Sequence, residues 1–335
     1  MDTAMNYVQL LIKNFNGDIQ QPILYEGIEL NMKRSGNPEK LTFKVQKGVG
    51  LSFNEGSEVS LTVDGTQMFV GYVFTKSRNK DGAINVTAYS QIRYLKNKYA
   101  TQYENKTATE VIQKLCDSFG VNYKDKDGKS AICDTQFKIA QRLEDNVTLL
   151  DMIQNALNLT LNATGKLYVL YDDCGVLTLK DIKDESMLLD FGVDSETAQN
   201  FDYETSIDKE SYNSITIVRD AQEGQHGAEK VHVEDGSHIK KWGHLQYFEK
   251  AQEGDSNLME KAKTLLELYN RETRTLRIKE AFGDLRVRAG CSIYVNLNLG
   301  DMVLTSRMVV EEVTHKFNKD IHTMDLAVIG HGFTK

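Results

Sequence analysis

Four histidines with a constant spacing of six residues are the first candidates for chemistry in this sequence: His226, His232, His238 and His244. Imidazole nitrogens are good ligands for zinc and copper. A spacing of six would keep all four on one side of a straight strand, but it matches neither a helical face nor the short ligand spacings of structural zinc sites. We therefore interpret them as surface and loop histidines, and we predict no metal site.

The four cysteines do not indicate redox or nucleophilic chemistry. Cys116, Cys133, Cys174 and Cys291 lie far apart, which fits neither a disulfide-dense secreted domain nor a zinc ribbon. Nothing in the local sequence around Cys116 or Cys291 suggests an activated nucleophile. We predict that all four are reduced, packed thiols.

Paired acids could in principle cleave a glycosidic bond, which needs two carboxylates facing that one bond. The candidates are Glu311-Glu312 and Asp172-Asp173, but neighbours on a strand point to opposite faces, and 48 acidic residues make such pairs expected. Trp242 and the tyrosines could line a sugar groove, although aromatic side chains on strands usually pack in cores. The standard hydrolase, zinc-protease, nucleotide and dinucleotide motifs are absent. We predict no enzyme, no cofactor, and no catalytic, cofactor-binding or metal-ligating residue.

Composition narrows the class further. The 335 residues carry a formal net charge of -8 and no dense Lys/Arg cluster, so sequence-specific nucleic-acid binding is not expected. No segment approaches the roughly 20 apolar residues that span a bilayer, and no secretory signal is evident at the N-terminus. We expect synthesis in a cytoplasm and no stable membrane insertion. With only two prolines and no low-complexity tract, the domains should pack against each other.

The elements that would position any site begin with short strands. Up to about residue 100, apolar and polar residues alternate between turn dipeptides, which is typical of antiparallel hairpins. The turns are Asp64-Gly65 and Asp81-Gly82, whose residues tolerate positive φ. The alternating apolar residues around them are Val59, Leu61, Val63, Met68, Val70, Tyr72, Ile84, Val86 and Ala88. This pattern predicts a small barrel or sandwich.

Helical periodicity follows. Thr107 to Glu110 has the spacing of a capping box, and the helix that it begins should end at Gly120. A second helix is predicted over 148–157, and residues 166–182 are predicted to form a hairpin around Asp173-Cys174-Gly175. This middle segment is predicted to be a small α+β domain.

From Asp190 onward strands return, interrupted by an exposed loop over 220–227 and by a third helix. Ser256 is the predicted cap of that helix, and Glu267 with Arg271 is a predicted i,i+4 pair. Strands are predicted over 308–313 and 324–329. The expected domains are therefore 1–100, 101–185 and 186–335, with an insertion around 222–282 in the last.

An ordered series of segments resembles a known family. These are the stretch from Gly56 to Gly65, Phe69 to Phe74, Ile84 to Ser90, Tyr94 to Lys96, the helix from Lys106, the helical segment Leu149 to Ile153, and the strand Lys166 to Tyr171. In this order they are similar to the late control protein D-like or XkdQ-type tail proteins, the baseplate hub of contractile phage tails and of phage-tail-like bacteriocins. The resemblance covers most of the chain and is weakest between Asp220 and Gly254.

The resemblance implies a β-rich α+β fold with two small tube-type β-barrel domains, an intervening α+β domain, and a helical insertion in the second barrel region. It implies a homotrimer whose six barrels join the sixfold tail tube to the threefold central spike, inside a virion or phage-tail-like particle. The implied partners are the tube protein, the spike protein, other baseplate proteins and the tape measure protein. The chain ends soon after its last strands, so any lytic activity is expected in a partner. A peptidoglycan-cleaving or a glycan-binding tail component is the alternative.

Overall fold

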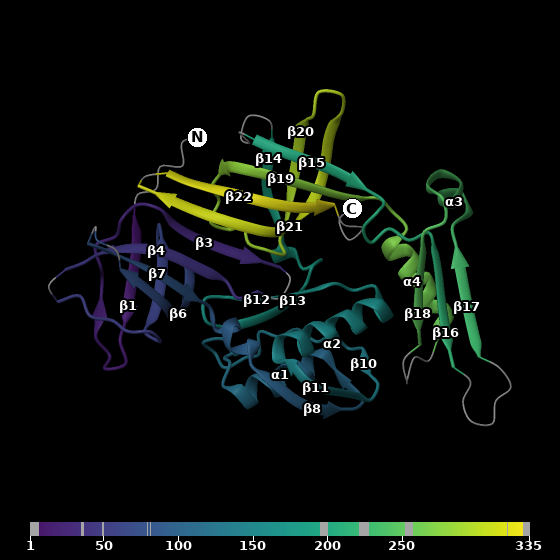
Figure 1. Cartoon of the computed structure of the whole chain (residues 1–335), viewed down its shortest axis with the longest axis horizontal. Helices are drawn as coiled ribbons and strands as arrows, with labels where there is room; N and C mark the ends of the chain where they lie inside the picture. The colour runs from purple at the N-terminus through teal and green to yellow at the C-terminus, as the bar shows by residue number, and fades with distance from the viewer. Residues whose placement is uncertain are drawn as a thin grey trace.

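The computed structural model describes residues 7–34, 37–48, 50–78, 80, 82–194, 200–220, 228–251, 257–319 and 321–330. Strands dominate the molecule, and helices are confined to a middle region and an insertion (Figure 1). The prediction of a β-rich protein with some helix is therefore confirmed.

The N-terminal strands follow the predicted alternation. They are β1 (Val8–Lys13), β2 (Ile19–Gln20), β3 (Ile28–Lys33), β4 (Lys40–Gln46), β5 (Glu58–Val63), β6 (Thr66–Arg78) and β7 (Ala83–Tyr89). Asp64 and Gly65 join β5 to β6 with φ values of 48° and 78°, as the predicted turn requires. Asp81, in the second predicted turn, lies outside the described residues.

A β-bulge in β6 changes which residues of that strand are buried. Leu61 pairs with Phe69 and Thr62 with Gln67, so Met68 is an extra residue between them. The buried face of β6 then continues through Phe69 and Val73, whereas Val70 and Tyr72, which continue the alternation in the sequence, are only partly buried. They lie on the opposite face, where Tyr72 contacts Tyr94 of the middle region at a centroid distance of 5.6 Å.

The middle region contains two helices, α1 (Ala108–Phe119) and α2 (Leu149–Thr164). The remaining elements are η1 (Gln91–Lys96), β8 (Lys98–Tyr103), β9 (Lys106–Thr107), β10 (Lys138–Ile139), β11 (Arg142–Thr148), β12 (Tyr168–Asp172), β13 (Leu177–Asp181) and η2 (Glu185–Met187). The capping box at Thr107, the end of α1 at Gly120 and the β12–β13 hairpin are confirmed. Helix α2 runs past its predicted end and stops at Gly165, which has a left-handed conformation. The buried Thr160 within it donates its hydroxyl to the Ala156 carbonyl.

The C-terminal strands are β14 (Leu188–Asp194), β15 (Asn200–Ser206), β19 (Thr273–Phe282), β20 (Ser292–Asn298), β21 (Val303–Asn318) and β22 (Ile321–Gly330). Strands β21 and β22 contain the two segments predicted near the C-terminus. Most buried side chains of these strands share one core with those of the N-terminal strands.

The insertion has a sheet of its own, which the sequence did not indicate. Strands β17 (Glu229–Glu234), β16 (Ser214–Arg219) and β18 (Gln246–Lys250) lie side by side in that order, and the helices are α3 (Gly236–Trp242) and α4 (Leu258–Tyr269). The N-cap of α4 is Asn257, whose side chain accepts a hydrogen bond from the Glu260 amide, while the predicted cap, Ser256, lies outside the described residues. Arg271 lies beyond the end of α4.

The two strand-rich ends were expected to be separate barrels, but their strands belong to one thirteen-stranded sheet. The link is an antiparallel ladder between β21 and β3, which includes Val313 opposite Met32. The path of this sheet ends at β15 and at β2 within the described residues. At the β2 end, the chain turns back toward β4, where the Tyr25 amide donates to the Lys44 carbonyl.

The strand order repeats within this sheet. The N-terminal part has the order β3-β4-β7-β6-β5-β1, and the C-terminal part has the order β15-β19-β22-β21-β20-β14. These orders are identical when the strands of each part are matched in the order in which they occur along the chain. Only the first strand differs, because β1 is antiparallel to β5 whereas β14 is parallel to β20. The long strands β6 and β21 even share a bulge, which places Phe74 and Glu311 at equivalent positions.

Candidate functional site

The structure separates the histidines of the regular spacing. His232 lies on β17, His238 lies on α3 and His244 follows that helix, while His226 is outside the described residues. The ring of His232 is 3.0 Å from the Thr216 hydroxyl. Within the described residues, no group of three or more His, Cys, Asp or Glu side chains could hold a metal ion.

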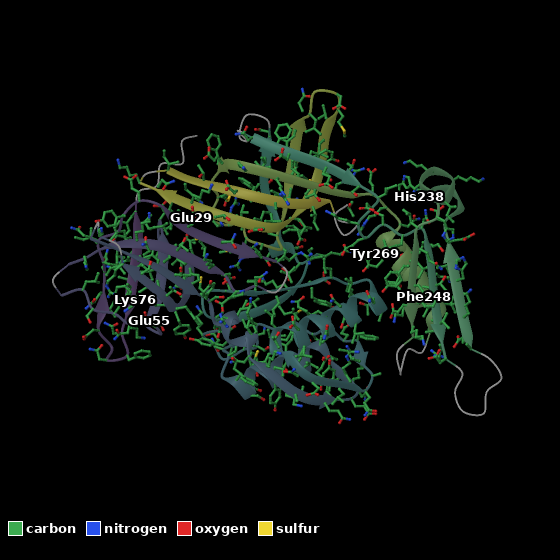
Figure 2. All side chains as sticks on the ribbon, viewed as in Figure 1. Glu29, Glu55, Lys76, His238, Phe248 and Tyr269 are labelled. Atoms are coloured by element: carbon green, nitrogen blue, oxygen red, sulfur yellow. The ribbon has the colours of Figure 1, made fainter. Side chains whose placement is uncertain are left out.

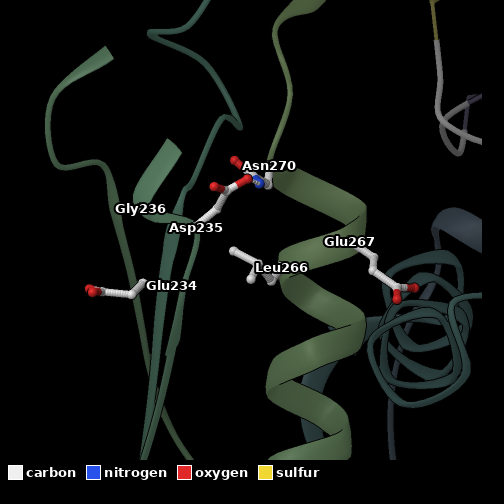
Figure 3. A pocket seen from close by; sticks show the side chains of 6 residues that line it. All are labelled: Glu234, Asp235, Gly236, Leu266, Glu267 and Asn270. Atoms are coloured by element: carbon white, nitrogen blue, oxygen red, sulfur yellow. Dashed lines mark hydrogen bonds between the residues drawn. The ribbon is translucent and has the colours of Figure 1, made fainter. Parts of the chain in front are cut away.

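His238 belongs to a clamp between α3 and the end of α4, of which Figure 3 shows Asp235 and Asn270. Asp235 caps α3 and accepts a hydrogen bond from the Asn270 side-chain amide at 2.7 Å, and Asn270 Oδ1 is 2.7 Å from His238 Nδ1. Because that oxygen can only accept, His238 Nδ1 carries the proton. Hydrogen bonds from Ser237 and Asn270 hold the pKa of Asp235 below its ordinary value.

An open cavity of about 430 Å³ lies beside this clamp, but its acids do not converge. Figure 3 shows Glu234 and Glu267 pointing away from one another, from β17 and α4. A glycosidase needs two carboxylates directed at one bond. The cavity therefore lacks the geometry for that chemistry.

The adjacent acids that the sequence singled out form ion pairs between segments. Glu311 accepts from Arg34 Nε at 2.5 Å, and Glu312 lies 3.1 Å from Lys33 Nζ and accepts from the Asn31 amide at 2.8 Å. All of these contacts cross from β21 to β3 or to the residue after it. They stabilise the ladder that joins the two halves of the sheet.

A second set of acids lies where three parts of the chain meet. Glu39 precedes β4, Asp172 ends β12, and Arg288 lies between β19 and β20. The Asp172 amide donates to Glu39 Oε1 at 3.2 Å, and Arg288 Nη1 donates to Asp173 Oδ1 at 3.2 Å. The Arg288 guanidinium also lies 4.1 Å from the centre of the Tyr171 ring, a cation–π contact. We call Glu39, Asp172, Asp173, Arg288 and Tyr171 the junction cluster.

Burial perturbs the carboxyls of the junction cluster. Removal from water, reinforced by the nearby Asp172, raises the pKa of Glu39 to about 8, and burial also raises the pKa of Asp172. Perturbed acids of this kind can mark an active site. However, the cavity beside Glu39 and Arg288 measures about 10 Å³, roughly the space of one water molecule. No sugar can enter it. A larger cavity of about 370 Å³ is lined in part by Tyr171, Asp173 and Arg288, but neither Glu39 nor Asp172 lines it. The two acids with perturbed pKa values therefore do not face this space, and the geometry favours a structural joint.

The cysteines are free thiols, as predicted, and two of them are buried. Burial raises the pKa of Cys116 to about 12 and of Cys291 to about 11, which keeps both protonated at neutral pH. Trp242 does not form a flat aromatic platform for a glycan, because its ring lies against His238 at 4.1 Å between centroids and is partly buried.

A buried histidine pair was not anticipated from the sequence. His315 on β21 and His322 on β22 are joined by a hydrogen bond of 2.9 Å between Nδ1 and Nε2. His315 Nε2 lies 2.9 Å from the Val287 carbonyl, which can only accept, so this nitrogen carries the proton and Nδ1 accepts from His322. Burial lowers the pKa of His315 to about 3 and of His322 to about 4. The one signal for this pair is that each histidine takes a buried position in a strand whose side chains alternate between buried and partly buried.

Large exposed apolar side chains occur at two hairpin ends of the sheet. Phe15, Ile19 and Ile23 are 82%, 62% and 70% exposed around β2, and Met302 and Val303 are 47% and 62% exposed at the β20–β21 end. Exposed apolar groups that gather in this way are typical of contact surfaces. In the described part of the chain, no helix is both long and apolar enough to span a bilayer.

Comparison with known proteins identifies the family. Residues 28–329 match the YqbQ-like family. The chain is 27% identical to the uncharacterized protein YqbQ of Bacillus subtilis over 317 residues, covering 92% of each chain. It is 26% identical to the Phage-like element PBSX protein XkdQ of the same organism over 284 residues, covering 83% of this chain and 82% of XkdQ. The resemblance to XkdQ-type proteins is therefore confirmed.

Two solved structures share this fold. The tail protein from Neisseria meningitidis superposes with a TM-score of 0.67 at 12% identity, covering 97% of both chains. A type VI secretion component from E. coli, which is similar to the T4 bacteriophage tail proteins gp27 and gp5, superposes with a TM-score of 0.55 at 11% identity, covering 96% of this chain and 77% of that chain. The match over residues 28–329 spans most of the sheet and the whole middle region, and on this ground the chain belongs to the YqbQ-like family.

Proposed function

We propose that this protein is a structural baseplate hub, which joins the sixfold tail tube to the threefold central spike of a contractile particle. The repeated strand order carries this proposal. Three copies with two equivalent sets of strands each would present six similar modules to a sixfold tube, while the whole assembly keeps threefold symmetry.

The proposed modules are tube-type barrels built from residues 1–100 and 186–335. The segment from Ile19 to Tyr25 supports a nearly closed first barrel, because β2 pairs with β1 at Gln20 opposite Ile12, and Leu24 forms a bridge to Val45 of β4. Residues 101–185 would form the α+β domain on their outside. The insertion, whose strands and helices run from β16 to α4, would be peripheral.

A mechanical role requires that the parts of each subunit do not move apart during contraction. Two features support this: the β21–β3 ladder, and the junction cluster, which ties the middle region to both halves of the sheet. Both are internal, so they would remain intact while the subunit transmits force. In this reading the chain is not an enzyme.

The proposed partners are two further copies of this chain, the tube and spike proteins, other baseplate proteins and the tape measure protein. The exposed apolar residues at the β2 end and at the β20–β21 end supply contact surfaces for them. The protein would act in a virion or phage-tail-like particle after synthesis in a bacterial cytoplasm.

The mass and symmetry of the purified full chain test the proposal, alone and mixed with tube and spike proteins. Light scattering and electron microscopy should reveal a threefold ring that caps the tube or takes up the spike. A monomer that ignores both partners would refute the hub. Release of fragments from purified peptidoglycan, or saturable glycan binding, would then favour a lytic or glycan-binding tail component.

A further inference from the structure

Strand β15 leaves one edge of the large sheet open. Its residues from Asn200 to Ser206 pair with β19 on one side, and the other side has no strand partner within the described residues. Most of its side chains are exposed, including Phe201 at 36%. A free edge of seven residues is a template for an additional strand. The repeat within this chain indicates which strand fits.

In the N-terminal half, the equivalent edge is already covered. Strand β3 is the counterpart of β15, and its outer edge pairs with the second half of β21, from Glu312 opposite Lys33 to Phe317 opposite Ile28. The first half of β21 uses the same edge to pair with β20, from Val303 to Val309. One long strand thus completes its own half of the sheet and then continues onto the other half.

Strand β6, the counterpart of β21, has the same extension without the second partner. Its first half pairs with β5 as far as Tyr72 opposite Glu58. Beyond Tyr72, β6 remains paired on its other edge with β7, up to Arg78 opposite Ile84. On the β5 side, no strand pairs with Thr75–Arg78 in the described part of the chain.

We propose that Thr75–Arg78 of β6 in one copy pairs with the free edge of β15 in a neighbouring copy, antiparallel and in the register of the internal β21–β3 ladder. This inference deepens the hub proposal and rests on the ring that it contains. The contact would be heterologous, since different surfaces of two copies meet, and such contacts form rings when their rotation closes. Around the ring, β21–β3 junctions within chains would alternate with β6–β15 junctions between chains.

The shared bulges give the register. Phe74 and Glu311 are equivalent, so Thr75 corresponds to Glu312 and Ser77 to Thr314. On the other side, Leu41 and Leu276 are equivalent, because they pair with Ala88 and with its counterpart Val328. Their own partners, Leu30 and Tyr203, therefore correspond to each other, and Asn31 corresponds to Glu204. Since Thr314 lies opposite Asn31 within the chain, Ser77 should lie opposite Glu204 between chains.

Burial supports the need for a partner on β15. Ile28, Leu30 and Met32 of β3 are at most 4% exposed beside β21. Their counterparts on β15 are Phe201, Tyr203 and Thr205, of which the first and last are exposed and Tyr203 is partly buried. An added strand would remove the apolar surface of Phe201 and Tyr203 from water, which is a favourable contribution to association.

Charge supports the choice of strand. In the first part of the internal junction the acids Glu311 and Glu312 are on the long strand, and their basic partners are Lys33 at the end of β3 and Arg34 after it. The proposed junction has the reverse polarity, with Asp202 and Glu204 on β15 and with Arg78 and Lys80 at the end of β6. Lys76 is already held within its own chain, 3.5 Å from Glu55 (Figure 2).

Disulfide trapping in the full chain tests this pairing. Residues opposite each other in an antiparallel ladder have Cα atoms about 4.5–5.5 Å apart, a separation that a disulfide can bridge. A mixture of the Ser77→Cys and Glu204→Cys variants should give a covalent dimer under mild oxidation, and the double variant should give longer covalent species. The Asn31→Cys/Thr314→Cys variant is the matched control, since those side chains are 2.8 Å apart within one chain and should react without an increase in mass.

Two further controls separate the possible failures. The Ser77→Cys/Asn200→Cys variant, shifted along β15, and the parent chain with its four native thiols should give only background cross-linking. A ring seen by light scattering in which Ser77 and Glu204 do not cross-link above background would overturn the β6–β15 pairing and leave the hub intact. A chain that stays monomeric and binds neither tube nor spike would overturn both.

Discussion

Several buried residues of this protein have pKa values far from their ordinary range. They lie at points where segments of the chain are joined. The His315–His322 pair links β21 to β22 and to the loop before β20, and Glu39 lies in the junction cluster. The cavity that Glu39 lines measures only about 10 Å³, which is too small for a substrate. The perturbed groups therefore bear on stability, and their effect depends on pH.

Stability should fall between about pH 6.5 and pH 4 because of the histidine pair. The folded pKa of His322 is about 4, below the ordinary value of 6.5, so the unfolded chain binds a proton that the folded chain excludes. Each group can contribute up to about 1.4 kcal/mol per pH unit in this window. His322→Gln, which can still donate to His315, should reduce the slope of unfolding free energy against pH in urea titrations.

The exposed His244 provides the control for this measurement. His244→Gln should leave the slope nearly unchanged, because this side chain is exposed and lies outside the buried pair. Equal slopes for wild type and His322→Gln would contradict the buried, neutral pair.

Glu39 should have the opposite dependence. Its folded pKa of about 8 exceeds the ordinary 4.5, so the folded chain retains a proton that the unfolded chain releases, and stability is lost as pH rises from 4.5 through 8. Glu39→Gln removes this titration and should become more stable relative to wild type at pH 8 than at pH 5. Glu29→Gln, at an exposed position of β3, is the matched control and should show no such trend.

At the scale of elements, the β6 bulge directs Phe69 and Gly71 into a crowded interior. A Cβ atom on Gly71 would lie 2.3 Å from the Tyr89 carbonyl oxygen and 2.4 Å from the Phe69 ring. Gly71→Ala should therefore destabilise the protein by at least about 1–3 kcal/mol, the usual cost of overpacking. Thermal or denaturant unfolding measures this loss. Gly236→Ala, where a Cβ would meet open space, should change stability by much less, and equal losses would argue against the packing around β6.

Local chemistry explains which elements were predictable. The capping box at Thr107, the turn at Asp64-Gly65 and the β12–β13 hairpin depend on neighbours in sequence, and all are present. The burial of β6 after Met68 was not predictable, because a bulge of one residue exchanges the two faces of a strand. The pairing of β21 with β3 joins residues about 280 positions apart, and nothing local specifies it. Part of the candidate site was missed for the same reason. Asp172 and Asp173 stood out as adjacent acids, but Glu39 and Arg288 did not, because they come from distant segments.

At the scale of the whole molecule, the large sheet and the insertion have separate hydrophobic cores. Leu258, Ala262 and Leu265 of α4 pack on Ile215 and Ile217 of β16, in a cluster distinct from the core of the large sheet. Figure 1 shows the insertion at one end of the molecule, beyond the strands of the sheet. It contacts the middle region through α4 and α2, where a Cβ on Gly165 would lie 3.4 Å from Thr264 Cγ2. The peripheral position suggests that assembly does not require it.

Removal of the insertion should leave a folded protein that still forms the ring. Ser206 ends β15 opposite Thr273 at the start of β19, and the Thr273 hydroxyl donates to the Ser206 carbonyl, so the two ends already lie at hairpin distance. Replacing residues 208–271 with a short Asn-Gly turn would convert β15 and β19 into a direct hairpin. Circular dichroism should show a cooperative unfolding transition, and light scattering should give the same number of subunits as the full chain. An aggregated or unfolded product would mean that the α4–α2 contact is essential to the middle region, and a folded monomer would mean that the insertion forms part of the subunit interface.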